Sequence, residues 1–222
     1  MNNVPVLTVN YETPDLILNL VSSFRKFYEN PFLIIDGSSQ EKYNELKELL
    51  KDFENIEIHN FDFNIHHAGG MAYGFNYLKS KQILVLDSDV TILKYGFLED
   101  LKKNLPKEAY GIGDCQFVDE NGFNIGSRKG AIGLRESEMT EGGYRYLHPA
   151  IMLVNRDVVL KYAMPEKHGA PMLSTMKDIH DKEMSHLLIH SEWVCNDFRN
   201  EEKIYTVHPW MGTVSRTGYN LE

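Results

Sequence analysis

The chain has 222 residues, which is long enough for one domain with a complete hydrophobic core. Its formal charge of −9 at pH 7 argues against strong binding to a nucleic-acid backbone, because such binding requires clustered Lys and Arg. No apolar run approaches the roughly 20 residues that span a bilayer. The opening Met1-Asn2-Asn3-Val4-Pro5 lacks the features of a signal peptide. We therefore expect a soluble, cytoplasmic protein without a membrane span.

The first half of the chain alternates strand-like and helix-like segments. Short apolar runs predict strands at residues 4–9, 32–35, 56–58 and 83–86. Apolar residues at helical spacing predict helices at about residues 13–27, 41–53 and 67–79, the first of them capped by Thr13 with Pro14 at its first position. This alternation implies βαβ units, and therefore a mainly parallel sheet.

The second half is less regular. Strands are expected at residues 110–117, 148–155 and 204–207, with a hairpin turn at Asn121-Gly122. Residues 124–143 and 163–177 have the composition of loops. Helices are expected at residues 157–162 and 178–190.

Polar residues follow three of the expected strands directly. These clusters are Asn10-Tyr11-Glu12, Asp36-Gly37-Ser38 and Asp87-Ser88-Asp89. In parallel sheets, ligands gather at the carboxyl ends of the strands, so the three clusters are expected to converge. Two carboxylates separated by one residue make an oxygen-rich site that can hold a divalent ion, and such an ion can neutralise a diphosphate.

Four segments, in this order, resemble the motifs of GT-A glycosyltransferases, most closely those of the large inverting family 2. They are Val9 to Asp15, Ile34 to Ser39, Asn64 to Asn76 and Leu84 to Asp89. The resemblance covers the chain before residue 110 and thins after it. It implies a GT-A-like, Rossmann-type α/β fold, with a mainly parallel central sheet flanked by helices. The whole chain, residues 1–222, would form a single domain, with a nucleotide-sugar-binding half at about 1–110 and an irregular acceptor-binding half at about 111–222.

The resemblance also implies roles for individual residues. Donor binding falls to Thr8, Asn10, Tyr11, Asp36, Gly69, Gly70, Asp87, Ser88 and Arg216. The metal ligands are Asp87, Asp89 and His208, a set that suits Mn²⁺ and, less well, Mg²⁺. The catalytic base is Asp178 or Asp181, although the Glu-Asp pair usual in the family is missing there. His148 and Trp210 are assigned to the acceptor.

Most of these residues also have a simpler interpretation. Gly69 and Gly70 can let a helix pack closely on the sheet. Tyr11 can merely cover the sheet edge. The pair His66-His67 can contact the nucleotide or lie in a surface loop. Asp178 precedes a stretch with helical spacing of apolar residues, so it can be a helix cap.

The predicted function is metal-dependent transfer of a sugar from a nucleoside diphosphate sugar, UDP-linked, to an acceptor hydroxyl. A sugar-phosphate nucleotidyltransferase is an alternative, but the segment after the first strand lacks the Gly-rich, basic loop of those enzymes. A second alternative is a GT-A-like module that binds a nucleotide or carbohydrate without turnover. The acceptor is a carbohydrate or another hydroxyl compound, and a nucleic-acid acceptor stays open because of the local basic residues Arg128, Lys129 and Arg135.

Overall fold

The computed structural model describes residues 4–123, 125, 143–166, 169–191 and 205–209. Its helices are α1 (Pro14–Arg25), α2 (Gln40–Leu50), α3 (His66–Tyr77), α4 (Phe97–Asn104), α5 (Arg156–Val159), α6 (Leu173–Asp181) and the 3-10 turn η2 (Ser185–Leu187). Its strands are β1 (Val6–Asn10), β2 (Phe32–Asp36), β3 (Ile56–Asn60), β4 (Gln82–Leu86), β5 (Thr91–Ile92), β6 (Gly111–Val118), β7 (Tyr144–Asn155), β8 (Leu188–His190) and β9 (Thr206–Val207). No helix among these residues is long and apolar enough to cross a membrane.

The central sheet has seven strands in the order β3-β2-β1-β4-β7-β6-β8. Strands β3, β2, β1 and β4 are parallel, as the βαβ pattern predicted. Strand β7 then runs antiparallel to both β4 and β6, and β8 pairs with β6 in parallel. A separate two-stranded sheet joins β5 to β9, which brings a late segment of the chain beside residues that follow β4.

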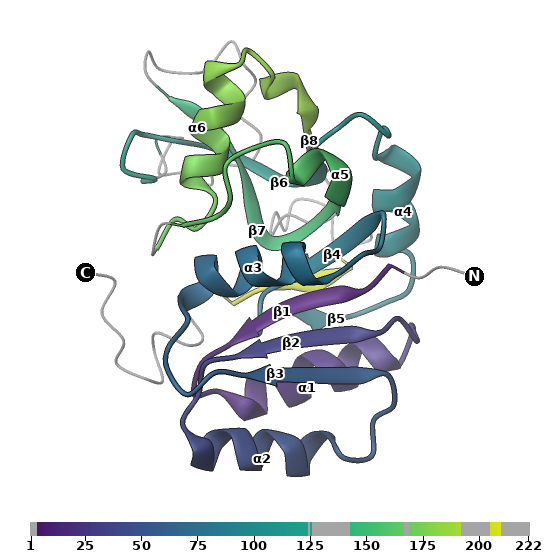
Figure 1. The fold of residues 1–222 in the computed structure, drawn as a ribbon. Helices are drawn as coiled ribbons and strands as arrows, with labels where there is room; N and C mark the ends of the chain where they lie inside the picture. The colour runs from purple at the N-terminus through teal and green to yellow at the C-terminus, as the bar shows by residue number, and fades with distance from the viewer. Residues whose placement is uncertain (1–3, 124, 126–142, 167–168, 192–204, 210–222) are drawn as a thin grey trace.

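Two hydrophobic cores cover the two faces of the sheet. Figure 1 shows α1 and α2 on one face of β1, β2 and β3, and α3 on the opposite face. Successive residues of β1 enter different cores: Val6 packs with α1, α2 and α4, while Leu7 packs with α3 and α6. This alternation is the period-2 geometry of a strand that is buried on both sides.

Helix α3 lies close to β1 because two of its three glycines face that strand. A Cβ on Gly70 would come within 2.7 Å of Val9, and one on Gly74 within 2.3 Å of a methyl group of Leu7. Gly70 therefore has the packing role that was one of its two interpretations. By contrast, a Cβ on Gly69 would meet only the Ile65 side chain, at 3.2 Å.

One helix of the second half was predicted at the wrong residues, and one helix before residue 110 was not predicted. Helix α6 begins at Leu173, inside the expected loop 163–177, and ends at Asp181. Its buried face consists of Leu173, Thr175, Met176 and Ile179. Glu183 has a φ of 57° in the left-handed region, so the helix cannot run on to residue 190, and β8 occupies that stretch instead.

Helix α4 was not expected, although it carries recognisable signals. Gly96 begins it with a φ of 118°, acidic residues lie in its first turn, and Phe97, Leu98 and Leu101 are buried. Asn121-Gly122 forms the expected turn, in which Gly122 has a φ of 91°. Most of the loop expected at 124–143 lies outside the described residues.

Candidate metal and nucleotide-sugar site

Strands β1, β2 and β3 are tied together where they end. Asn10 and Asp36 are the last residues of β1 and β2 and face each other in register. The Asn10 amide donates to Asp36 Oδ1 at 2.8 Å, and the Ser38 hydroxyl donates to the same oxygen at 2.6 Å. Asn60, which ends β3, donates to Asp36 Oδ2 at 3.0 Å. One fully buried carboxylate thus fixes three strand ends.

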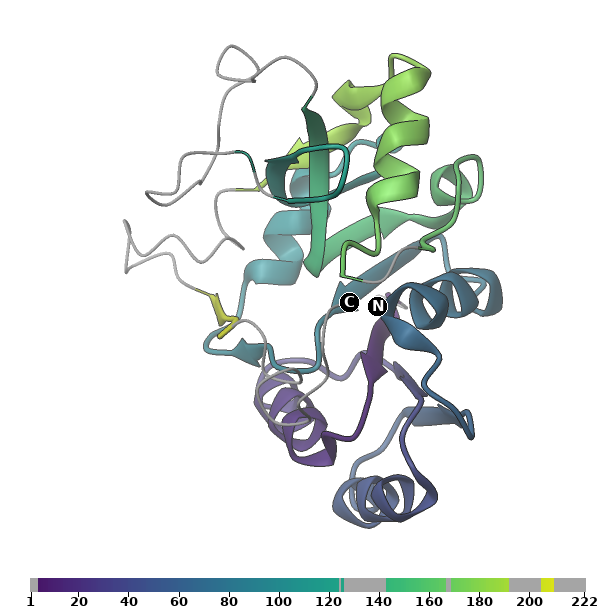
Figure 2. The same ribbon diagram turned by 90° about the vertical axis from the view of Figure 1, so that its left-hand side faces the viewer.

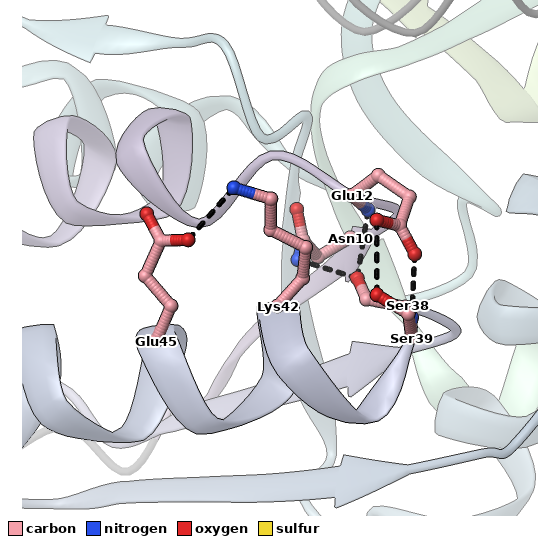
Figure 3. Close-up of polar contacts among 6 residues, drawn as sticks. All are labelled: Asn10, Glu12, Ser38, Ser39, Lys42 and Glu45. Carbon is pink, nitrogen blue, oxygen red and sulfur yellow. Dashed lines mark hydrogen bonds and ion pairs between the residues drawn. The ribbon is translucent and has the colours of Figure 1, made fainter.

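The loops that follow β1 and β2 are also joined, through Glu12. Its backbone N–H donates to Ser38 Oγ at 2.7 Å, and Ser39 donates to its carboxylate through both the backbone N–H and the hydroxyl (Figure 3). Glu12 has a φ of 58°, so the loop makes a sharp turn at this residue. Tyr11 is half-buried on this tethered loop. Glu12 belongs to the predicted polar cluster after the first strand, but it had no predicted role.

Asp87, Asp89 and His208 form a cluster whose ligand atoms all lie within 4.8 Å of one another. His208 Nε2 is 2.9 Å from Asp89 Oδ1 and 3.5 Å from Asp87 Oδ2. The two carboxylates come from the segment that follows β4, and His208 comes from the segment that follows β9. Pairing of β5 with β9 explains why residues so distant in the sequence meet. Figure 2 shows this short sheet from the side on which β1 and β2 end.

The electrostatics of the cluster favour a positive charge. Burial lowers the pKa of His208, but its hydrogen bond to Asp89 and the charges of Asp87 and Asp89 outweigh burial and raise that pKa. Asp89 and His208 are both buried, at 6% exposure each. Two carboxylates and one imidazole are a donor set that suits Mn²⁺, and the residues present therefore fit a divalent ion.

His67, in the first turn of α3, also reaches the cluster. Its Nε2 lies 3.2 Å from Asp87 Oδ1. The sequence left His67 undecided between a nucleotide contact and a surface loop, and the structure places it in a helix against the first carboxylate. A histidine that holds a metal-binding carboxylate in position is a common supporting feature of metal sites.

A bulge in β7 lies beside the same carboxylates. Gly113 of β6 pairs with Met152, but Cys115 pairs with Leu147, so β7 carries extra residues between these points. Within this bulge, Ala150 accepts a hydrogen bond from the Asp87 N–H at 2.9 Å and donates its own N–H to His148 Nδ1 at 3.2 Å. Burial, together with the charges of His208 and His67, lowers the pKa of His148 to about 3, so its ring is neutral. Bulges of this kind often re-aim side chains near functional sites.

The remaining predicted residues are distributed unevenly. Thr8 is completely buried inside the sheet, and Ser88 is buried between the two carboxylates of the cluster. Asp178 lies in the last turn of α6, so it is not a helix N-cap; its carboxylate contacts Lys182 Nζ at 2.8 Å and accepts the Ala163 N–H at 2.8 Å. Asp181 is exposed at the end of that helix. Trp210 and Arg216 lie outside the described residues.

Comparison with known proteins places the chain in a family. A model of the family described as glycosyl transferase family 2 matches residues 6–162, which is more than half of the chain. A search of curated proteins found no significant match.

Solved structures with the same fold include several glycosyltransferases. Galactosyltransferase LgtC, in complex with donor and acceptor sugar analogues, is 12% identical with a TM-score of 0.57, over 85% of this chain and 73% of that one. A mannosyltransferase from Pyrobaculum calidifontis, in complex with GDP-Man and Mn²⁺, is 9% identical with a TM-score of 0.57, over 88% of this chain and 58% of its own. TarS from S. aureus, residues 1–349 in complex with UDP-GlcNAc, is 15% identical with a TM-score of 0.54, over 80% of this chain and 53% of that one. At these identities the likeness establishes the GT-A fold alone.

Proposed function

This chain belongs to glycosyl transferase family 2, and we propose that it moves a sugar from a UDP-linked donor to an acceptor hydroxyl with the help of a divalent metal. The observation that carries the proposal is the Asp87–Asp89–His208 cluster, which follows strand β4. Strand β4 is the parallel neighbour of β1, whose end is fixed to Asp36. A charge-bearing site thus adjoins a rigid set of strand ends, which is where α/β sheets bind nucleotides.

Each part of the cluster has a role under this proposal. Asp89 and His208 would hold the ion directly, and Asp87 would hold it or reach it through water. When bound, Mn²⁺ would neutralise the diphosphate and so stabilise the charge of the leaving group. His67 and the Ala150 carbonyl restrain Asp87 from two sides, which reduces the reorganisation needed when a donor binds.

The donor side of the site is built mainly from the first half of the chain. Asn10, Asp36 and Ser38 are tied to one another, and they hold the loop that carries Tyr11. We propose that Tyr11 contacts the base, and that the fully buried Asp36 acts on the donor side by holding the strand ends that carry this loop. UDP is the first nucleotide to test because TarS is described with UDP-GlcNAc, and GDP is the second because the Pyrobaculum enzyme is described with GDP-Man.

A thermal-shift panel tests the proposal directly. UDP-, GDP-, dTDP- and CMP-sugars are each added with and without Mn²⁺, and ligand binding raises the apparent melting temperature by mass action. The expected result is a shift with a UDP-sugar that requires the metal. Incubation with a sugar 1-phosphate and a nucleoside triphosphate provides the opposite test, since pyrophosphate release would indicate a nucleotidyltransferase.

A further inference from the structure

Asp114 is a carboxylate beside the metal cluster that the sequence did not single out. It lies in β6 between Gly113 and Cys115, opposite the bulge of β7 that contacts Asp87. Its side chain is only 14% exposed. On its other side, β8 ends at His190, which pairs with Gly113. The sheet therefore holds Asp114 between the bulge of β7 and the end of β8.

The two oxygens of Asp114 have different surroundings. Oδ2 accepts a hydrogen bond from Gln116 Nε2 at 2.8 Å. Oδ1 is buried, and no hydrogen-bond donor among the described residues reaches it. The nearest charged candidate is His190 Nδ1 at 4.0 Å, but that nitrogen accepts the Cys115 N–H at 3.2 Å and so carries no proton. A hydroxyl that reached Oδ1 would therefore meet an acceptor that no described donor occupies.

The surroundings of Asp114 raise its pKa. Burial is the main cause, while the Gln116 hydrogen bond and the charge of His208 oppose the increase. His208 in turn contacts Asp87 and Asp89. A carboxylate with a raised pKa that lies near the Asp87–Asp89–His208 cluster without belonging to it has the properties of a general base.

We propose that Asp114 is the catalytic residue that binds the acceptor hydroxyl and takes its proton. This inference rests on the glycosyltransferase function proposed above. In the step, the acceptor oxygen forms a bond to the anomeric carbon, and the bond from that carbon to the diphosphate oxygen breaks. The electron pair of the broken bond stays on the diphosphate, and the hydroxyl proton moves to Asp114 Oδ1.

This assignment competes with the two carboxylates that the family resemblance suggested. Asp178 is held by Lys182 and by the Ala163 N–H at the far end of α6 from Met172. The beginning of that helix, rather than its end, approaches the site, because the Met172 N–H donates to the Tyr146 hydroxyl at 3.2 Å, and Tyr146 lies beside His148. Asp181, one turn further along, is exposed.

Donor hydrolysis tests the proposal without knowledge of the natural acceptor. Water takes the place of the acceptor hydroxyl, and its attack also requires loss of a proton. UDP or GDP release from UDP-GlcNAc, UDP-glucose and GDP-mannose is measured with Mn²⁺ for the wild type, Asp114→Asn and, as a matched surface control, Asp157→Asn. We expect Asp114→Asn to lower kcat by about 100-fold, with unchanged donor KM and an unchanged UDP–Mn²⁺ thermal shift.

The outcomes separate the two proposals. Wild-type kcat in Asp114→Asn overturns the role of Asp114 and leaves the glycosyltransferase proposal standing. Loss of the UDP–Mn²⁺ thermal shift in Asp114→Asn also overturns it, because a residue on the acceptor side should leave donor binding intact. If Asp178→Asn lowers kcat and Asp114→Asn does not, the catalytic base is Asp178 on α6. A wild type that neither binds nor hydrolyses any of these donors refutes the proposed function, and the role of Asp114 with it.

Discussion

The two halves of the molecule present their polar residues in different ways. Up to Leu86 the strands are parallel, and most candidate residues lie at the end of a strand, directly after it, or in the first turn of a helix. Beyond Tyr110 the sheet becomes mainly antiparallel. The residues at or near the cluster then come from the bulge of β7, from the short strand β8 and from the segment that follows β9. The proposed donor contacts thus rest on repeated local geometry, and the proposed acceptor contacts on irregular geometry.

This difference explains why one half matches a family motif more readily than the other. A parallel βαβ unit fixes the direction of the residue that follows each strand, so the same residue types recur at the same places. A bulge depends on pairing between distant strands and leaves no short motif in the sequence. Four variants test this contrast.

The largest effect is expected for Asp89→Ala. Loss of the central carboxylate should remove metal-dependent charge stabilisation, which is worth several kcal/mol, and so reduce donor turnover roughly 1,000-fold. The measurement is UDP release from the best donor at saturating Mn²⁺. Asp157→Ala, an 81% exposed carboxylate on α5, is the control. A metal-dependent rate near that of the wild type in Asp89→Ala would exclude Asp89 as a ligand.

Gly74→Ala tests the close packing of the donor half. The new methyl group would meet Leu7 at 2.3 Å, and overpacking of this kind costs about 1–3 kcal/mol of unfolding free energy. Denaturant unfolding measures the loss. Gly69→Ala is the matched control, because its Cβ would meet only Ile65 and alanine favours a helix. Equal stability of the two variants would contradict the packing explanation.

His67→Ala tests whether α3 supports the metal site. Loss of a partner that positions a metal-binding carboxylate should lower the affinity for Mn²⁺ by about 10-fold, which is the low end of the usual range. Titration of Mn²⁺ followed by thermal shift measures this change. His66→Asn is the control, since Asn tolerates the φ of 60° found at that exposed neighbour. If His67→Ala leaves the affinity for Mn²⁺ unchanged, the contact between His67 and Asp87 does not contribute to metal binding.

Asp178→Asn should have the smallest effect on stability. The hydrogen bond from Lys182 lowers the pKa of Asp178, so its contribution is present above the unfolded-state pKa and disappears as the pH falls through the folded-state value. At neutral pH the variant should lose about 0.5 kcal/mol, as is usual for exposed ion pairs. Urea unfolding at pH 7 and at low pH measures the difference. A loss of the same size at both pH values would exclude the ion pair as its cause.

Much of the donor half was predictable from the sequence. Strand ends, the parallel order of β1, β2 and β3, and the meeting of Asn10 with Asp36 follow from periodicity and chain direction. The meeting of His208 with Asp87 and Asp89 was expected from the family resemblance, and the structure brings the three together. Roles of these residues in metal binding and catalysis stay predictions.

The acceptor half was less predictable for physical reasons. Prolines before α6 suggested a loop, although Leu173, Met176 and Ile179 have helical spacing and are buried. Asp114 became visible only through the register shift between β6 and β7, which depends on pairing between strands far apart in the chain. Local propensity contains no information about such a shift.

Strand β7 has a consequence for any attempt to divide the protein. Its second part pairs with β4 from Ile151 to Asn155, and its first part continues along β6. A fragment that stopped near residue 110 would leave one side of β4 open, with a row of unmatched amide groups flanked by apolar Leu84 and Leu86. Such an edge invites self-association. The part before residue 110 should therefore not be separable as a free-standing module, and the sheet should melt as one cooperative unit.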